Sequence, residues 1–240
     1  MPSPLADRAT ILLTGATSGI GRALKDRLLA QGHELIVVSR TAVKDAEGAT
    51  AYACDLADPV AVGALCSEIK ERHPDISVII NNAAVQHAAA LTQTTPAQVV
   101  EEAMLNLVAP ALIVQAFLPG LLMRSAPSAI LNVSSGLAFF PKESTSLYCA
   151  TKAGLHSLSQ SLRYACERSN VVVSEVILPL VATPMTEGRG RGKLTADNAA
   201  DAIIAGIKAN RAEIWVGKAR LIPVIQRLMP SVGRSLLRRG

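Results

Sequence analysis

The stretch that decides the fold is Thr14-Gly15-Ala16-Thr17-Ser18-Gly19-Ile20-Gly21. The apolar run Ala9–Leu13 precedes it and the amphipathic run Ile20–Ala30 follows it, which predicts a strand, a tight turn and a helix. In such a turn the first glycine permits the bend, the second lets the backbone approach a pyrophosphate, and the third lets helix and strand pack closely. Free backbone N–H groups at the start of the helix then face the phosphates. The stretch therefore predicts a dinucleotide site.

The rest of the chain alternates between short apolar runs and helical patterns. Strands are predicted at Ala9–Leu13, Glu34–Ser39, Thr50–Cys54, Ser77–Ile80, Ala129–Val133, Val171–Leu178 and Glu213–Val216. Helices are predicted at Ile20–Ala30, Pro59–Arg72, Pro96–Met123, Ser146–Arg168 and Asp197–Asn210. Strands without polar alternation, separated by helices, indicate a parallel sheet covered on both faces. We therefore expect a single α/β domain over residues 1–240, a doubly wound Rossmann fold with about seven strands.

The composition argues against several other classes of protein. Half of the 240 residues are hydrophobic and 18% are charged, which argues against disorder. The net charge of +5 is concentrated at one end, because residues 214–240 carry six basic and no acidic side chains. The remaining chain has 18 basic and 19 acidic residues, and aromatics make up 3%. A nucleic-acid partner is therefore not expected.

Two features bear on where the protein resides. The four cysteines fit no zinc or redox spacing, and no secretory signal is present, so we expect free thiols in the cytoplasm. Residues 103–123 carry no charge and are long enough to span a membrane. Because Asn106, Pro110 and Pro119 interrupt this stretch, we expect instead a helix buried on the sheet, partly in a subunit contact.

The residues that end the second predicted strand indicate which cofactor is preferred. An acid there hydrogen-bonds the ribose 2′-hydroxyl group and repels a 2′-phosphate. This chain has Ser39-Arg40-Thr41 instead, and a guanidinium can hold a phosphate with two hydrogen bonds. We therefore expect NADP(H) to be preferred over NAD(H), the alternative being that Arg40 is a solvated surface residue.

A second motif, Tyr148-Cys149-Ala150-Thr151-Lys152, falls within a predicted helix. Residues four apart share a helix face, so Tyr148 and Lys152 point at one site. A phenol has a pKa near ~10, and nearby positive charge favours the phenolate. Ser135 closes the fifth strand, at the sheet edge where ligands bind. Ser134 is the alternative, and strand alternation points the two side chains to opposite faces.

Taken together, these motifs, Asn81-Asn82-Ala83-Ala84 and Asn106 resemble the short-chain dehydrogenase/reductase family, from about Thr10 to Thr183. The resemblance implies hydride transfer between a nicotinamide and a carbonyl/alcohol substrate. Tyr148 would be the general acid/base, and Ser135 would hydrogen-bond the substrate oxygen. Lys152 would lower the pKa of Tyr148 and hold the ribose, and Asn106 would keep a water beside Lys152.

The same resemblance implies the cofactor contacts. Besides Tyr148 and Lys152 they are Gly15, Thr17, Ser18, Gly19, Ile20, Gly21, Ser39, Arg40, Thr41, Asp55, Leu56, Asn82, Ala83, Pro179 and Thr183. Asp55 would contact the adenine and Thr183 the nicotinamide carboxamide. No metal is expected, and the partners are a small-molecule substrate and further copies of the chain, as a dimer or a tetramer. Enoyl reduction or epimerisation on the same scaffold, and a non-catalytic NADP(H)-binding sensor or scaffold protein, are the alternatives.

Two segments depart from the family pattern. Residues 184–194 form the expected substrate loop, in which Arg189 and Arg191 are interpreted as solvated rather than as contacts to an anionic substrate. Residues 217–240 form a basic amphipathic C-terminal extension. We interpret it as docked on its own body, with a partner subunit, a lid over the site or a membrane surface as alternatives.

Three further residues stand apart from these motifs. Ala84 occupies a position where the family usually has glycine, which is tolerable if its φ is negative. His156 lies eight residues after Tyr148 on the same predicted helix and is interpreted as a packing residue. Trp215 is expected in the core or in an interface.

Overall fold

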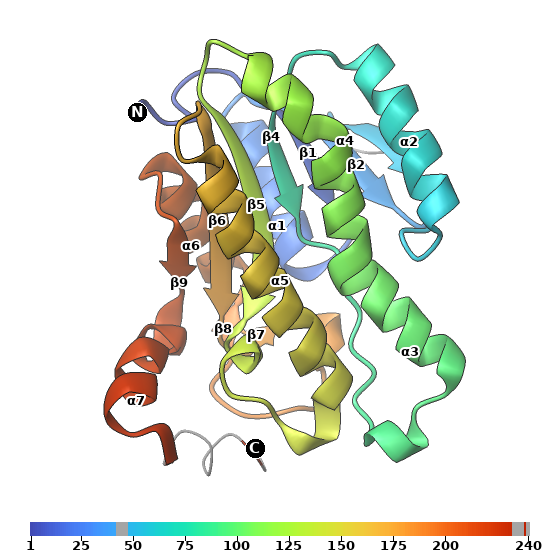
Figure 1. Cartoon of the computed structure of the whole chain (residues 1–240), viewed down its shortest axis with the longest axis vertical. Helices are drawn as coiled ribbons and strands as arrows, with labels where there is room; N and C mark the ends of the chain where they lie inside the picture. The colour runs from blue at the N-terminus through green and yellow to red at the C-terminus, as the bar shows by residue number, and fades with distance from the viewer. Residues whose placement is uncertain (42–47, 232–237, 239–240) are drawn as a thin grey trace.

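One parallel sheet forms the centre of the molecule (Figure 1). The computed structural model describes residues 1–41, 48–231 and 238. Its seven strands follow the order β3-β2-β1-β4-β5-β6-β9, every pair being parallel. They are β1 (Thr10–Thr14), β2 (Glu34–Ser39), β3 (Thr50–Ala53), β4 (Ile76–Asn81), β5 (Ser128–Ser135), β6 (Val171–Leu178) and β9 (Glu213–Trp215). The order reverses between β1 and β4, which confirms the doubly wound Rossmann fold and opens a crevice at the carboxyl ends there.

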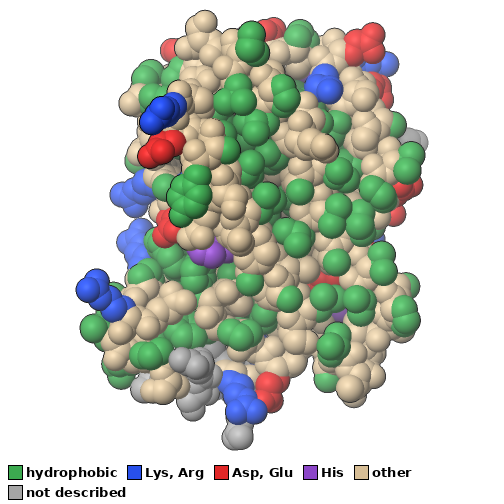
Figure 2. Space-filling view, viewed as in Figure 1, with side chains coloured by type: hydrophobic (Ala, Val, Ile, Leu, Met, Phe, Trp, Pro, Cys, Tyr) green, Lys and Arg blue, Asp and Glu red, His purple; other side chains and the backbone are tan. Residues whose placement is uncertain are grey.

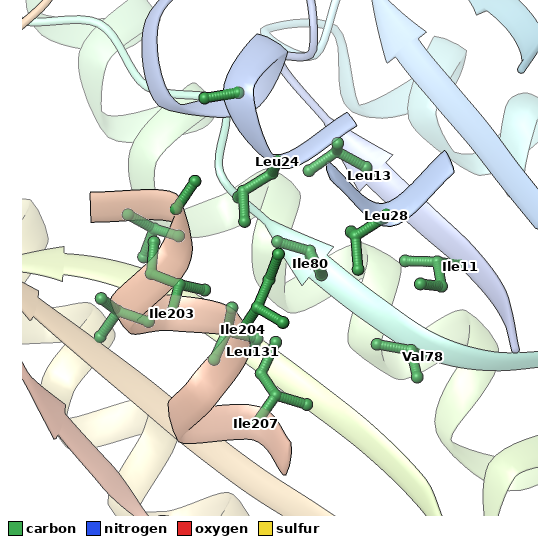
Figure 3. Packing of buried hydrophobic residues seen from close by; sticks show 14 of the residues in the cluster. Ile11, Leu13, Leu24, Leu28, Val78, Ile80, Leu131, Ile203, Ile204 and Ile207 are labelled. Carbon is green, nitrogen blue, oxygen red and sulfur yellow. The ribbon is translucent and has the colours of Figure 1, made fainter. Parts of the chain in front are cut away.

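Helices cover both faces of the sheet. In the view of Figure 1, α1 (Gly19–Ala30) and α6 (Ala196–Lys208) lie behind it, and α2 (Pro59–Arg72), α4 (Ala109–Met123) and α5 (Ser146–Cys166) lie in front. Figure 3 shows the rear layer, where Leu24 and Leu28 of α1 and Ile203, Ile204 and Ile207 of α6 meet the side chains of β1, β4 and β5. Because strand residues alternate between faces, each face has its own apolar core.

The predicted helix Pro96–Met123 consists of three segments. It begins as α3 (Pro96–Ala103), passes through a π-helical turn at Met104–Val108, and continues as α4. Pro110 has no N–H to donate to the carbonyl of Asn106 four residues earlier, so a regular α-helix is broken at Asn106. By length and composition the whole segment could cross a membrane, with a mean hydropathy of 1.8 over its most apolar stretch. In the structure the part from Leu105 to Leu121 packs on the sheet, as expected, whereas α3 extends beyond the ends of the strands (Figure 1).

The region after β6 holds a small second sheet that the sequence pattern did not predict. Strand β7 (Val181–Ala182) pairs with β8 (Leu194–Thr195), so the expected substrate loop is tied together at its base. Helix α6 then begins at the Thr195 cap, whose Oγ1 accepts a hydrogen bond from the Asn198 N–H at 3.1 Å.

The described part of the C-terminal extension packs on the body of the protein. Helix α7 (Ile222–Leu228) buries Ile222 and Ile225 against Phe140 and Trp215. Val224 and Leu228 of α7, and Leu221 directly before it, are exposed, as expected for an amphipathic segment. Residues 232–237, 239 and 240 of the extension lie outside the described residues.

Candidate active site

The glycine turn joins β1 to α1 at the carboxyl edge of the sheet. Gly15 has a φ of +71°, and a Cβ there would lie 2.8 Å from the Ala83 Cα. A Cβ on Gly21 would lie 1.9 Å from the Gly15 carbonyl oxygen, so these two positions require glycine. Ser18 precedes α1 without capping it through its side chain, and Thr17 and Ser18 are exposed. The backbone N–H groups of the first turn of α1 are therefore available to an anion, as the pyrophosphate role requires.

The loop after β4 braces this turn. The Thr14 hydroxyl accepts hydrogen bonds from the backbone N–H groups of Asn82 at 3.1 Å and Ala83 at 3.0 Å. The Asn82 amide in turn donates to the carbonyls of Thr14 and Gly15, both at 3.0 Å. Among the described residues only Asn210 has a positive φ without being glycine, so Ala84 meets the condition for replacing glycine. Two predicted cofactor residues, Asn82 and Ala83, thus shape the turn through direct contacts.

The residues expected to bind the adenosine end lie at the ends of β2 and β3. The Ser39 hydroxyl donates to the Thr41 carbonyl at 2.8 Å, which bends the chain directly after β2. The side chain of Arg40 is 72% exposed, and its guanidinium lies 3.8 Å from the Glu101 carboxylate, a loose pairing. Asp55 is exposed after β3, and Leu56 is buried beside it. The Arg40 guanidinium is therefore accessible to a phosphate group.

The Tyr148-x-x-x-Lys152 pair lies on α5 where that helix passes the ends of β4 and β5. Lys152 is buried, its Nζ donates to the Val133 carbonyl at 2.9 Å, and it lies 5.5 Å from the centre of the Tyr148 ring. Burial lowers the pKa of Lys152 to about 8, and the carboxyl groups of Glu175 and Glu102 oppose that fall. Burial also raises the pKa of Tyr148, an effect that Cys149 and Glu102 reinforce and that Ser135 and Arg189 oppose.

Ser135, rather than Ser134, lies beside Tyr148. The Ser135 hydroxyl interacts with the Tyr148 side chain and accepts a hydrogen bond from the Leu137 N–H at 3.2 Å. The Ser134 side chain is buried under the sheet edge, and its Oγ has no partner among the described residues. Strand alternation at the end of β5 therefore separates the two serines as the sequence pattern indicates.

Asn106 occupies the π-helical turn and is fully buried. Its Oδ1 accepts from the Val85 N–H at 2.9 Å, and its Nδ2 donates to the Val85 carbonyl at 2.9 Å and to the Thr151 hydroxyl at 3.3 Å. The side chain therefore joins the loop after β4 to α5 next to Lys152. Both N–H groups of the amide are used by these contacts, and the backbone carbonyl of Asn106 lacks the usual donor because Pro110 has no N–H, so this carbonyl is an acceptor that a water could meet.

Comparison with known proteins identifies this arrangement. The family model of the short chain dehydrogenases matches residues 9–193, which include every residue of the candidate site. The chain belongs to the short-chain dehydrogenase family. It is therefore an oxidoreductase by family.

Individual relatives span almost the whole chain. An uncharacterised oxidoreductase, DltE, of Bacillus subtilis is 33% identical, covering 85% of this chain and 86% of its own length. The 1-deoxy-11-beta-hydroxypentalenate dehydrogenase of Streptomyces avermitilis is 32% identical, over 86% and 84% of the two chains. A short-chain dehydrogenase of Sphingobium yanoikuyae solved with NADPH superimposes with a TM-score of 0.81, at 27% identity, over 93% and 95% of the two chains.

The expected substrate loop begins close to the glycine turn. A Cβ on Gly19 would lie 2.8 Å from the Thr183 side chain, so the predicted carboxamide contact borders the predicted pyrophosphate contact. Pro179, by contrast, lies at the end of β6, where the Cβ position of Gly217 comes near its ring. A cavity of about 270 Å³ opens beside the turn, with Ser18, Gly19 and Pro184 in its wall, and it does not reach Tyr148.

The structure corrects the interpretation of Arg189 as a solvated residue. Arg189 is only partly exposed, and its guanidinium donates to the Gln86 side chain at 2.7 Å. Gln86 belongs to the loop after β4, so this hydrogen bond links the two loops on either side of the crevice. Arg189 also acts electrostatically on Tyr148, where its positive charge opposes the rise in the pKa of the phenol.

Sequence reasoning missed two buried carboxyl groups near Lys152. Glu102 on α3 is 1% exposed, and burial raises its pKa. Glu175 on β6 is fully buried and lies 2.6 Å from the His156 Nδ1. The His156 ring also packs on Phe139, with ring centres 4.6 Å apart, so the packing role is as expected and the contact with Glu175 is what the sequence did not indicate. An acid in the middle of the apolar run Val171–Leu178 was the available signal, because a charged residue is rarely buried without a partner.

Proposed function

We propose that this short-chain dehydrogenase interconverts a carbonyl and an alcohol with NADP(H), and that Tyr148 is the general acid/base. One observation carries the proposal: Lys152 is buried between Tyr148 and the Val133 carbonyl at the carboxyl edge of the sheet. Burying an ammonium group is costly, and strongly shifted groups in a crevice cluster at sites of chemistry. A protein that only bound the cofactor could hold the ribose with Lys152, but it would not need Lys152 beside the buried phenol of Tyr148 and next to Ser135.

Each residue of the proposed site has its own role in the reaction. The nicotinamide, when bound, supplies or accepts the hydride. In the reductive direction Tyr148 gives its proton to the substrate oxygen, since its raised pKa keeps it protonated near neutral pH. Ser135 donates a hydrogen bond to the same oxygen. In the oxidative direction the Lys152 ammonium favours the phenolate that accepts the proton.

Arg40 supports the preference for NADP(H). Arg40 directly follows β2, and its guanidinium is exposed. No acidic residue stands at the end of this strand. The related Sphingobium enzyme was solved with NADPH. Solved structures of this fold hold either nicotinamide cofactor, so the chain's own residues decide the preference. A 2′-phosphate would replace the loose pairing of Arg40 with Glu101 by a bidentate contact.

We further propose a homo-oligomer in the cytoplasm. The face over α4 and α5 carries few charges in its centre (Figure 2). Large apolar side chains are exposed at the ends of these helices, namely Leu122, Met123 and Tyr164. An exposed apolar face of this kind is typical of a subunit contact. Gel filtration with light scattering tests the oligomer, and a monomer at micromolar concentration would contradict it.

A panel of carbonyl compounds tests the function itself. Wild-type protein is mixed with NADPH and ketones and aldehydes of varied size, and the loss of NADPH absorbance is followed. We expect turnover with at least one compound and a corresponding alcohol in the product. Tight NADPH binding without turnover on any carbonyl, enone or sugar would instead favour the sensor role.

A further inference from the structure

A row of polar side chains crosses the sheet beneath α5. Strand register places four residues side by side on β4, β5, β6 and β9: Asn81, Asn132, Glu175 and Glu213. Partners in a parallel register point to the same face, here the face that α5 covers. Asn81 donates to Asn132 at 2.9 Å, so the row begins as a hydrogen-bonded chain. Such a row is unusual in the buried strands of a parallel sheet, which are mostly apolar.

Helix α5 packs a polar stripe against this row. The stripe consists of Lys152, His156, Ser159 and Arg163, spaced four, three and four residues apart on one face. The Asn132 amide donates to Ser159 at 2.9 Å, His156 lies 2.6 Å from Glu175, and Arg163 lies 3.6 Å from Glu213. The contacts fix the rotation of α5, and Tyr148 lies one turn before Lys152 on that helix.

Glu175 is the member of the row whose charge acts on Lys152. Its side chain is fully buried, its Oε2 is bonded to His156, and its Oε1 has no hydrogen-bond partner among the described residues. The Lys152 Nζ donates to Val133, the neighbour in sequence of the residue that pairs with Glu175. A buried carboxylate with an unused oxygen next to a buried ammonium group is a counter-charge.

Other charged groups face the same site from the elements packed around it. Glu102 approaches from α3, Tyr148 and His156 lie on α5 itself, and Arg189 reaches Tyr148 from the substrate loop. Glu213 lies beyond Glu175 on β9 and is partly exposed. Two buried acids act on Lys152, and their hydrogen bonds differ: Glu102 accepts a long bond of 3.4 Å from the His87 N–H, whereas Glu175 lies 2.6 Å from the His156 ring nitrogen.

We propose that Glu175, held by His156, is a positioning residue that keeps Lys152 protonated beneath the catalytic tyrosine. His156 supplies the hydrogen bond that a buried carboxylate requires, and Glu175 supplies the charge that a buried ammonium requires. The consequence for catalysis rests on the proposed role of Lys152 toward Tyr148. The effect on the protonation of Lys152 does not depend on it.

NMR titration of Lys152 tests the proposal without any turnover. The protein is labelled with ¹³C and ¹⁵N in lysine, and the Lys152 resonance is assigned by its absence from Lys152→Met. In Glu175→Gln we expect the midpoint of this titration to fall by about one pH unit, the size of effect of a nearby opposite charge. Glu213→Gln, the next acid in the row, is the matched control and leaves the midpoint unchanged.

Two variants of His156 keep the test decisive if Glu175→Gln does not fold. His156→Gln retains a donor for the carboxylate and leaves the midpoint near the wild-type value. His156→Leu removes the donor, which disfavours the charged form of Glu175, and moves the midpoint in the same direction as Glu175→Gln. An unchanged midpoint in folded Glu175→Gln, or in folded His156→Leu, would show that the pair only anchors α5 and would overturn the proposal.

The pH profile of alcohol oxidation gives an independent reading. In Glu175→Gln the rising limb of kcat/KM moves to higher pH, because a less charged Lys152 favours the Tyr148 phenolate less. A loss of stability alone would lower the rate without moving the limb. If no alcohol is oxidised by the wild type, the proposed function fails while the NMR titration still decides the role of Glu175.

Discussion

At the scale of single residues, Lys152 shows the conflict between stability and function. Its pKa is about 8 in the folded protein and ~10.5 in an unfolded chain, so the unfolded state binds more protons between these values. Below pH 8 the buried charge of Lys152 lowers the free energy of unfolding by its full amount. This penalty disappears as the pH rises from 8 to 10.5.

We therefore expect the stability of the wild type relative to Lys152→Met to rise by up to about 3 kcal/mol between pH 7 and pH 10.5. Most of this rise should fall between pH 8 and pH 10, because the buried ammonium loses its proton there. Urea unfolding at four pH values measures it, with Lys70→Met, at an exposed position of α2, as the control. A difference that does not change with pH would show that Lys152 is not strained by its burial.

Arg40 makes a second prediction at the residue scale. NADPH should bind at least about tenfold more tightly than NADH, and Arg40→Gln should remove most of that difference because the phosphate loses a bidentate partner. Isothermal titration calorimetry measures both affinities. Arg72→Gln, which also removes an exposed arginine, is the control. Equal affinities in the wild type would contradict the role of Arg40.

At the scale of elements, the β1–α1 turn depends on glycine where two backbones meet. Gly21→Ala places a Cβ against the Gly15 carbonyl, and the turn must open. We expect cofactor binding to be lost and the free energy of unfolding to fall by about 1–3 kcal/mol or more. Gly63→Ala, in open space on α2, should instead stabilise the protein by about 0.5–1 kcal/mol. Thermal unfolding and NADPH titration of both variants measure these effects. A similar loss of stability in Gly63→Ala would show that the protein does not tolerate alanine for glycine in general.

Elements with strong local signals could be predicted from the sequence. The bounds of β2, α2 and β6 agree with the prediction because apolar runs, a proline at a helix start and β-branched residues mark them. Strand β5 is longer than predicted, since Ser128, Ser134 and Ser135 continue the ladder despite being polar. Pro110 marks the π-helical turn locally, but the sequence analysis did not use it to divide the helix. The β7–β8 pair joins the two ends of a loop, and no local pattern contains that contact.

The motif residues of the candidate site could also be predicted from the sequence, but the charged groups around them could not. Motif spacing and family resemblance indicated Ser135, Tyr148 and Lys152, and the structure brings these three together. The charges that surround Lys152 escaped prediction, because Glu102 and Glu175 come from different elements that only the fold brings together. Spacing along the chain identifies partners on one helix but not across a sheet.

At the scale of the whole molecule, the doubly wound topology collects these groups at one edge. The carboxyl ends of β1, β4, β5 and β6 deliver the glycine turn, the bracing loop, Ser135 and the substrate loop to a single crevice. The crevice lies where the strand order reverses, so it is set by the topology of the sheet and not by any single residue. Cofactor binding should therefore stabilise the entire fold.

Thermal unfolding with cofactor measures this stabilisation. NADPH at one hundred times its dissociation constant should add about 2.7 kcal/mol to the free energy of unfolding. The same concentration of NADH should raise the Tm less. A midpoint that NADPH leaves unmoved would contradict a folded-state cofactor site.

The central claim is that Tyr148 transfers the proton in an NADP(H)-dependent reaction. Tyr148→Phe tests it most directly, with Tyr164→Phe, at an exposed position of the same helix, as the control. The account predicts that Tyr148→Phe binds NADPH with the wild-type affinity yet reduces its carbonyl substrate at least about 100-fold more slowly, while Tyr164→Phe retains full activity. Reduction by Tyr148→Phe at the wild-type rate would contradict it.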